Sequence, residues 1–135
     1  MHENDFYDDL AGALEQSWRL LEEAIDDTTS PVRTPVLISV ATDGLAQGRT
    51  VVLRGINRQQ RQLHIYTDVR SAKVAQLRAQ PACTLVAYQP NPMMQLRLGS
   101  DAIVNHNNAI THQAWAMMPG PNRCNYLTHP DPGSI

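Results

Sequence analysis

The chain has 135 residues, of which 42% are hydrophobic, and a formal net charge of −2. This length and apolar content indicate one compact domain over residues 1–135 with a core of its own. The two cysteines, Cys83 and Cys124, form no CxxC or Cys/His pattern, which argues against a metal site or a disulfide scaffold and favours a reducing cytoplasm. The apolar runs are too short to cross a bilayer, and the acidic N-terminus is unlike a secretory signal, so no membrane partner is expected.

Charge is distributed unevenly along the chain. Residues 1–27 hold nine of the 13 acids against one base, whereas residues 28–135 hold ten bases against four acids. Such a local excess of positive charge in a nearly neutral chain favours an anionic ligand held by specific side chains. Nucleic acid is the main alternative. Because the bases are dispersed rather than clustered, we expect a small anion and no nucleic-acid partner.

An amphipathic helix is predicted over residues 4–26. Its apolar side chains recur at spacings of three and four, which places them on one face. Acids crowd its first turn, where the helix dipole favours them. The apolar positions are Phe6, Leu10, Leu14, Trp18, Leu21 and Ile25.

A series of short strands follows, with a turn at Thr42–Gly44 between the first two. The predicted strands are Val36–Ala41, Arg49–Ile56, Gln62–Thr67, Cys83–Tyr88 and Met94–Val104. A short helix over Ser71–Gln80, with Ser71 as its N-cap, precedes the fourth strand, and a second over Asn108–Met118 follows the fifth. This order favours a mainly β fold, an antiparallel barrel with flanking helices.

The segment Arg49–Arg54 is the first candidate for binding chemistry. Alternation along a strand places Arg49, Val51 and Leu53 on one face. It places Thr50, Val52 and Arg54 on the other. An arginine within a β-branched run is costly to desolvate unless it meets an anion. The competing interpretation is an edge strand with two solvated arginines.

The segment Tyr66–Lys73 is the second candidate. A strand ends, a short turn follows and a helix begins at Ser71, so the unpaired N–H groups and positive end of that helix lie beside a hydroxyl and the ammonium of Lys73. This combination suits a phosphate. The competing interpretation is an ordinary N-cap with a solvated lysine.

Together the two segments resemble the flavin-binding signature of the pyridoxamine 5'-phosphate oxidase family. The family pattern is an Arg-x-Val-x-Leu-Lys/Arg strand, then Tyr-Thr, then Ser-x-Lys, followed by a glutamine on the next strand. The matching positions here are Arg49–Arg54, Tyr66-Thr67, Ser71-Ala72-Lys73 and Gln95. The resemblance covers roughly residues 35–104 and the preceding helix. It implies an FMN-binding antiparallel split barrel.

The resemblance also implies roles for single residues. Arg49, Ser71 and Lys73 would hold the FMN phosphate, and Tyr66 and Thr67 would line the region of the ribityl chain and phosphate. The backbone of Thr50, Val51, Val52 and Leu53 would lie along the flavin ring. Arg54 would face cofactor and substrate, Gln95 would contact the cofactor, and Arg123 would approach it from the partner subunit. The implied assembly is a homodimer with FMN at the interface.

Two departures from the family pattern stand out. Ala72 occupies a position that often holds an arginine, so one phosphate contact is missing, and Arg70, two residues away, is a candidate to replace it. The chain also ends at Ile135, where the true oxidases continue with strands that carry an Arg-x-His substrate motif. The resemblance therefore supports a flavin site of the oxidase-related branch, with C-terminal strands missing, better than vitamin B6 chemistry.

The favoured function is that of an FMN-dependent oxidoreductase acting on a small-molecule substrate or electron donor, with no assigned catalytic acid or base and no metal. A non-catalytic carrier or sensor of FMN or haem is an alternative, in which His64, His106 or His112 would ligate the haem. A structural dimer with a decayed pocket is the other.

Overall fold

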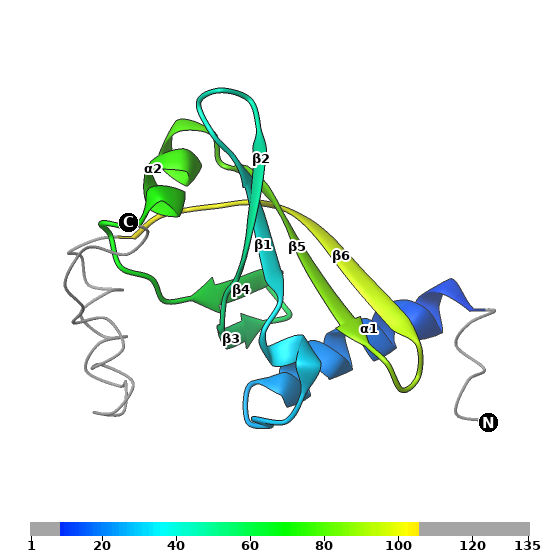
Figure 1. Ribbon diagram of the computed structural model, residues 1–135. Coiled ribbons are helices and arrows are strands. Elements are labelled where there is room, and N and C mark those ends of the chain that lie inside the picture. The colour runs from blue at the N-terminus through cyan, green and yellow to red at the C-terminus, as the bar shows by residue number, and fades with distance from the viewer. Residues whose placement is uncertain (1–8, 106–135) are drawn as a thin grey trace. The chain divides into compact units, whose positions relative to one another are not determined.

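The computed structural model describes residues 9–105, whose elements are labelled in Figure 1. The helices are α1 (Leu10–Ala24), the 3-10 helix η2 (Pro31–Arg33) and α2 (Ala72–Ala79). The strands are β1 (Val36–Val40), β2 (Ala46–Thr50), β3 (Leu53–Asn57), β4 (Gln62–Ile65), β5 (Ala82–Gln89) and β6 (Met94–Asp101). No helix in this range is long and apolar enough to cross a membrane.

The described strands form two sheets, one of four strands in the order β2-β1-β5-β6 and one of two strands, β3-β4. β1 pairs antiparallel with β5, with Leu37 opposite Leu85. β3 pairs antiparallel with β4, and the register shifts between Leu53 and Gly55. A Cβ on Gly55 would lie 3.3 Å from the Cβ of His64, so glycine permits this close approach of the two strands.

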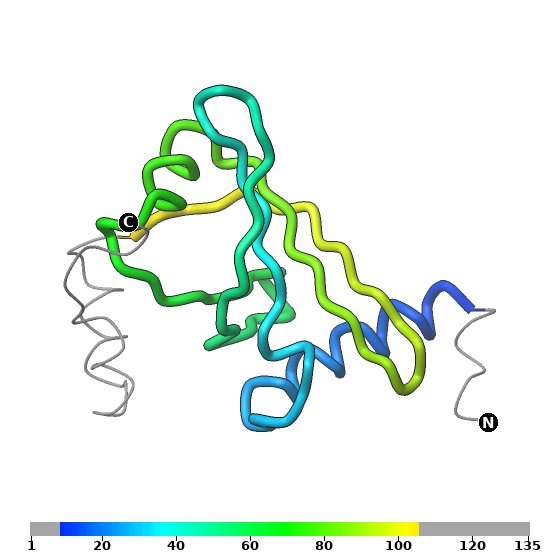
Figure 2. The backbone as a smooth tube through the Cα atoms, viewed as in Figure 1, coloured from blue at the N-terminus to red at the C-terminus, as the bar shows by residue number. Residues whose placement is uncertain are grey.

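The turn predicted at Thr42–Gly44 is confirmed. The Gly44 N–H donates to the Ala41 carbonyl at 2.9 Å, and the Ala41 N–H donates to the Leu45 carbonyl at 2.9 Å. Gly44 has a φ of +86°, which glycine adopts without steric cost. The tube in Figure 2 follows the chain through this turn from β1 into β2.

Helix α1 is shorter than predicted. Its N-cap is Asp9, whose carboxylate accepts from the Ala11 N–H at 3.1 Å, and its first turn contains no acid. The predicted start at residue 4 and the predicted acidic first turn were therefore wrong, because the capping carboxylate begins the helix later. Leu10 and Leu14 are exposed. Only the later part of the predicted apolar face is therefore buried, and Phe6 lies outside the described residues.

The residues group into two compact units. Among the described residues, one unit contains residues 9–38, Gly48–Tyr66 and Thr84–Gly99, and the other contains Ser39–Gln47, Thr67–Cys83 and residues 100–105. The expectation of a single domain over residues 1–135 stays a prediction.

The first unit holds the main apolar core. Its buried members come from α1, η2 and strands β3, β5 and β6: Leu20, Leu21, Ala24, Val32, Leu53, Ala87 and Leu96. Leu53 and Val32 are fully buried. After α1 ends, the Arg33 Nη1 donates to the Ile25 carbonyl at 2.6 Å, which satisfies a backbone acceptor left by the helix.

The second unit is built around α2. Ser71, Val74 and Leu77 recur at a spacing of three and are all buried, so they form the inner face of the helix. Ser39 of β1 is fully buried and donates its hydroxyl to the Gln76 Oε1 at 2.5 Å. α2 is therefore held by both apolar packing and a buried polar contact.

One predicted strand was wrong. The segment Arg49–Ile56 was expected to be continuous, but β2 ends at Thr50 and β3 begins at Leu53. Between them the Val51 N–H donates to the Pro35 carbonyl at 2.9 Å, outside either ladder. The other predicted strands and the helix after Ser71 are confirmed, with ends that differ by at most three residues. The predicted helix over Asn108–Met118 lies outside the described residues.

Candidate functional site

Arg49 is anchored against β1 at the end of β2. Its Nη1 donates to the Leu37 carbonyl at 3.2 Å, and its side chain is partly buried. This burial lowers the pKa of the Arg49 guanidinium, which stays a cation at any physiological pH. The competing interpretation of this segment was an edge strand with two solvated arginines. The partial burial of the Arg49 side chain argues against full solvation of this arginine.

The alternation predicted for the segment Arg49–Arg54 persists through the break between strands. Val51 and Leu53 are buried, whereas Thr50 is exposed and Val52 is half-buried. The residues of one face therefore fill the core. The other face, with Thr50, Val52 and Arg54, is the one that remains accessible to a ligand.

Arg54, in the same segment, carries a buried donor without an acceptor. Its side chain is half-buried, and its Nε is buried without a hydrogen-bond partner among the described residues. A buried guanidinium N–H without an acceptor costs free energy, on the order of 1–3 kcal/mol.

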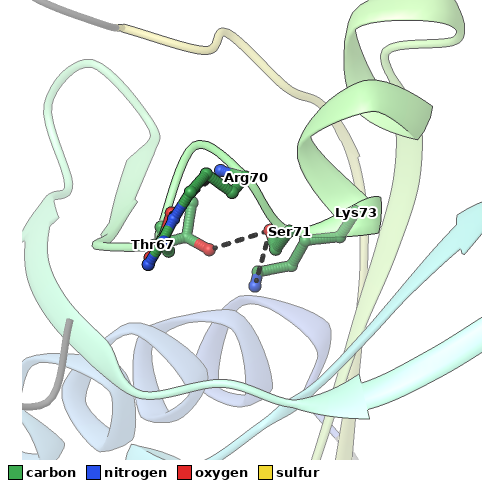
Figure 3. A network of polar contacts seen from close by, with 5 residues as sticks. Thr67, Arg70, Ser71 and Lys73 are labelled. Atoms are coloured by element: carbon green, nitrogen blue, oxygen red, sulfur yellow. Dashed lines mark hydrogen bonds and ion pairs between the residues drawn. The ribbon is translucent and has the colours of Figure 1, made fainter. Parts of the chain in front are cut away.

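The turn between β4 and α2 gathers three of the predicted site residues. The Lys73 Nζ donates to the Ser71 Oγ at 3.2 Å, and the hydroxyls of Thr67 and Ser71 lie 3.4 Å apart. Figure 3 shows the Lys73 side chain folding back toward Ser71. Tyr66, just before this turn, is half-buried.

Ser71 occupies the N-cap position of α2 as predicted, but its hydroxyl does not cap the helix. Its backbone is extended, with φ −68° and ψ 149°, and it makes no side-chain capping bond. The hydroxyl instead contacts Thr67 and Lys73. Because the first N–H groups of a helix have no intrahelical acceptor, this end of α2 offers donors and a positive dipole end beside an ammonium. That donor set suits a phosphate.

Asp68 forms an ion pair with Arg70 within the same turn; the sequence analysis named Arg70 but neither Asp68 nor this pairing. The Arg70 Nη2 lies 2.6 Å from the Asp68 Oδ2. Hydrogen bonds from the side chain and backbone of Arg70 lower the pKa of Asp68 to about 2, aided by the nearby charge of Lys73. The signal in the sequence was an Asp-x-Arg turn immediately before an N-cap serine.

The remaining predicted site residues are not part of the cluster in this turn. Gln95 lies on β6 and is exposed, as is His64 on β4. Arg123 lies outside the described residues. Within residues 9–105, no group of three or more His, Cys, Asp or Glu side chains is placed to hold a metal ion.

Comparisons with known proteins point to one family. Residues 15–106 match the family model described as the FMN-binding domain of pyridoxamine 5'-phosphate oxidase. A crystal structure of a pyridoxamine 5'-phosphate oxidase-related, FMN-binding protein from Nostoc punctiforme is 27% identical, with a TM-score of 0.67. The match covers 100% of this chain and 68% of that one. No curated protein matches the chain.

PhzG from Burkholderia lata, solved in complex with tetrahydrophenazine-1-carboxylic acid, has the same fold with a TM-score of 0.73 and 16% identity. The match covers 97% of this chain and 64% of PhzG, so the chain spans about two thirds of the length of both structures. These neighbours confirm the predicted fold class, an antiparallel split barrel with an N-terminal helix.

Proposed function

The chain belongs to the pyridoxamine 5'-phosphate oxidase FMN-binding domain family, and on that premise we propose that it binds FMN and works as a flavin-dependent oxidoreductase. The turn before α2 carries the proposal: a hydroxyl that does not cap its own helix, with an ammonium 3.2 Å away. The Nostoc relative is described as FMN-binding, which supports the choice of ligand.

The phosphate of FMN fits the donors of this turn. Ser71 and Lys73 hold it together with the first N–H groups of α2, since a dianionic ester needs several donors and cations. The family pattern assigns a role in phosphate binding to Arg49 as well, whose side chain is partly buried. Thr67 and Tyr66 line the region of the ribityl chain.

The flavin ring fits the accessible side of the segment Thr50–Leu53. The backbone of this segment would lie along the ring, and the side chains of Val51 and Leu53 are buried in the core. The guanidinium of Arg54, which is half-buried, supplies positive charge toward the cofactor or substrate. Gln95 would contact the cofactor, as the family pattern implies.

Bound FMN would supply two-electron redox chemistry between a donor such as a nicotinamide or an amine and an acceptor such as oxygen. The residues of this chain bind and orient the cofactor. Arg54 holds positive charge beside the ring and stabilises negative charge that develops there. No side chain is assigned as an acid or base.

The functional unit is a homodimer with FMN at its interface, and its other partner is a small-molecule substrate or electron donor. A small barrel offers only part of a pocket for a ring the size of flavin, and a two-fold axis completes it with the same residues of a second copy. The chain has two cysteines and no CxxC pattern, and this cysteine usage favours the cytoplasm as the compartment.

The test is the absorbance spectrum of the purified protein from about 300 to 600 nm, recorded before and after FMN is added and free flavin is removed by gel filtration. Twin flavin bands that elute with a dimer are expected. Arg49→Ala and Lys73→Ala should weaken them, whereas Arg78→Ala, an exposed arginine in the last turn of α2, should not. A protein that stays colourless at saturating FMN contradicts the proposal and favours a haem carrier or a structural dimer.

A further inference from the structure

The two central strands of the four-stranded sheet, β1 and β5, are apolar on both faces. Leu37 and Leu85 lie opposite each other and are buried. Their neighbours along the strands, Val36 and Val86, also lie opposite each other, and because side chains alternate along a strand they belong to the other face. An antiparallel sheet with only one covered face usually alternates apolar and polar residues. The sequence of these strands is therefore typical of a sheet that is covered on both faces.

The second face, which we call the outer face, is formed by five side chains of β1 and β5. Val36 is 37% exposed and Tyr88 is 47% exposed, and the three others are half-buried. None of the five carries a charge. The centres of protein interfaces are likewise depleted of charge and enriched in tyrosine. The five residues are Val36, Ile38, Thr84, Val86 and Tyr88.

Two residues that the family pattern connects with the flavin lie at opposite edges of the outer face. On β2, a Cβ on Gly48 would lie 3.2 Å from the Val36 Cγ1, so Gly48 and also Thr50, two residues on, share this face. On β6, Leu96 is buried in the core, so its neighbour Gln95 lies on the outer face, where it is exposed.

Within one chain, the apolar width of the outer face separates these two residues. The strand order is β2-β1-β5-β6 (Figure 1), so three strand spacings, about 14 Å, lie between Thr50 and Gln95. A flavin ring along the backbone of Thr50–Leu53 would have to cross β1 and β5 to reach Gln95 of its own chain. A two-fold axis parallel to the strands removes this separation, because it brings β6 of one copy over β2 of the other.

We propose that two copies of the chain pack through their outer faces and that the partner subunit's Gln95 contacts the flavin that lies along Thr50–Leu53. This inference rests on the proposed function and adds to it the joining surface and the residue that crosses it. A second copy fits this surface because the outer face is continuous at β2 with the segment assigned to the flavin ring. One contact then covers the apolar side chains and completes the site. The competing arrangement is a flavin ring that reaches Gln95 within a single chain.

The first experiment measures the mass in solution by light scattering after gel filtration, with circular dichroism to confirm folding. Tyr88→Arg should halve the mass of the dimer, because an unpaired charge buried at an interface is costly. Val36→Arg, on the neighbouring strand, should do the same. Leu10→Arg is the matched control, since it replaces a leucine of α1 that is 90% exposed, and it should stay dimeric. A folded Tyr88→Arg or Val36→Arg protein that remains a dimer overturns the inference, as does a monomeric wild type.

The second experiment asks which copy supplies Gln95. Chains with Gln95→Ala and chains with Lys73→Ala carry different affinity tags, and the mixed dimers are isolated by two successive purifications. If Gln95 acts across the interface, the Gln95→Ala chain combines its own Lys73 with the partner subunit's Gln95. Half of the sites should then bind FMN with the wild-type dissociation constant, and the other half more weakly than either variant homodimer. A mixed dimer without any wild-type site places Gln95 within its own chain and overturns the inference.

The remaining outcomes separate this inference from the function on which it rests. The Gln95→Ala homodimer should bind FMN about twofold to tenfold more weakly, as expected for one lost hydrogen bond, and an unchanged affinity overturns the role of Gln95. A monomeric Tyr88→Arg protein with wild-type affinity for FMN also overturns it, because the site is then complete in one chain. A wild-type dimer that binds no FMN contradicts the proposed function, whereas the mass of Tyr88→Arg still tests the interface.

Discussion

The hydroxyl of Ser39, on β1, donates to the Oε1 of Gln76, on α2, at 2.5 Å, and Ser39 is fully buried. The Gln76 Nε2 in turn donates to the Gln47 Oε1, on β2, at 2.7 Å. Gln76 lies one turn beyond Lys73, so this contact holds the helix whose start we assign to the phosphate.

The contact between Ser39 and Gln76 should be measurable as a coupling energy. Ser39→Ala, Gln76→Ala and the double variant, compared by chemical denaturation, should give a coupling of about 0.5–1.5 kcal/mol, the usual net value of a hydrogen bond. The same cycle with Gln80→Ala, an exposed residue at the end of α2, should give none. A coupling near zero for Ser39 and Gln76 would contradict the contact.

The Asp68 carboxyl should titrate far below the usual range. Its pKa lies at about 2 rather than 3.8, because the side chain and backbone of Arg70 donate to it. Since the folded-state pKa is the lower one, this pair stabilises the fold above about pH 3.8 and the contribution is lost as the pH falls through about 2. Carboxyl ¹³C NMR should show this midpoint, and Arg70→Ala should move it back up. Arg78→Ala should leave it in place, and an unshifted midpoint in the wild type would refute the pairing.

Arg58 should stabilise the first unit in a salt-dependent way. It follows β3 and pairs with two carboxylates of α1, Glu15 at 2.7 Å and Glu22. These pairs are partly solvated, so screening weakens them. Arg58→Met should lower the melting temperature at low salt and have much less effect near 1 M salt, where the screening length is about 3 Å. Arg61→Met, in the same loop and exposed, is the control, and a salt-independent loss in Arg58→Met would argue against an ionic contribution.

The sequence predicted the fold well where local patterns carry the information. Short strands separated by turn residues indicated an antiparallel β protein, and Ser71 before an eight-residue helix was read correctly as an N-cap position. These features depend on residues that are neighbours in the chain. The turn at Thr42–Gly44 was predicted in the same way, from a glycine that adopts a positive φ.

The features that sequence reasoning missed depend on distant partners. Nothing in the run from Arg49 to Ile56 marks the break after Thr50, because the cause is a hydrogen bond from Val51 to Pro35. Likewise, the N-cap pattern identified the position of Ser71 but not that its hydroxyl would contact Lys73 instead of capping α2. The sequence therefore identified candidate site residues that lie on local motifs. It did not predict the contact of Asp68 with Arg70 or that of Gln76 with Ser39.

The two faces of the segment Arg49–Arg54 should respond differently to truncation. Leu53 is fully buried in the core of the first unit, and Thr50 is exposed. Leu53→Ala should lower the free energy of unfolding by about 2–5 kcal/mol, because it leaves a cavity, whereas Thr50→Ala should change it by less than about 0.5 kcal/mol. Urea denaturation measures both changes in the free energy of unfolding.

Bound FMN should partly restore the stability of Leu53→Ala. A ligand that binds only the folded state adds about 2.7 kcal/mol at 100 times its dissociation constant. Equal effects of the two substitutions would show that this segment does not divide into a core face and a ligand face.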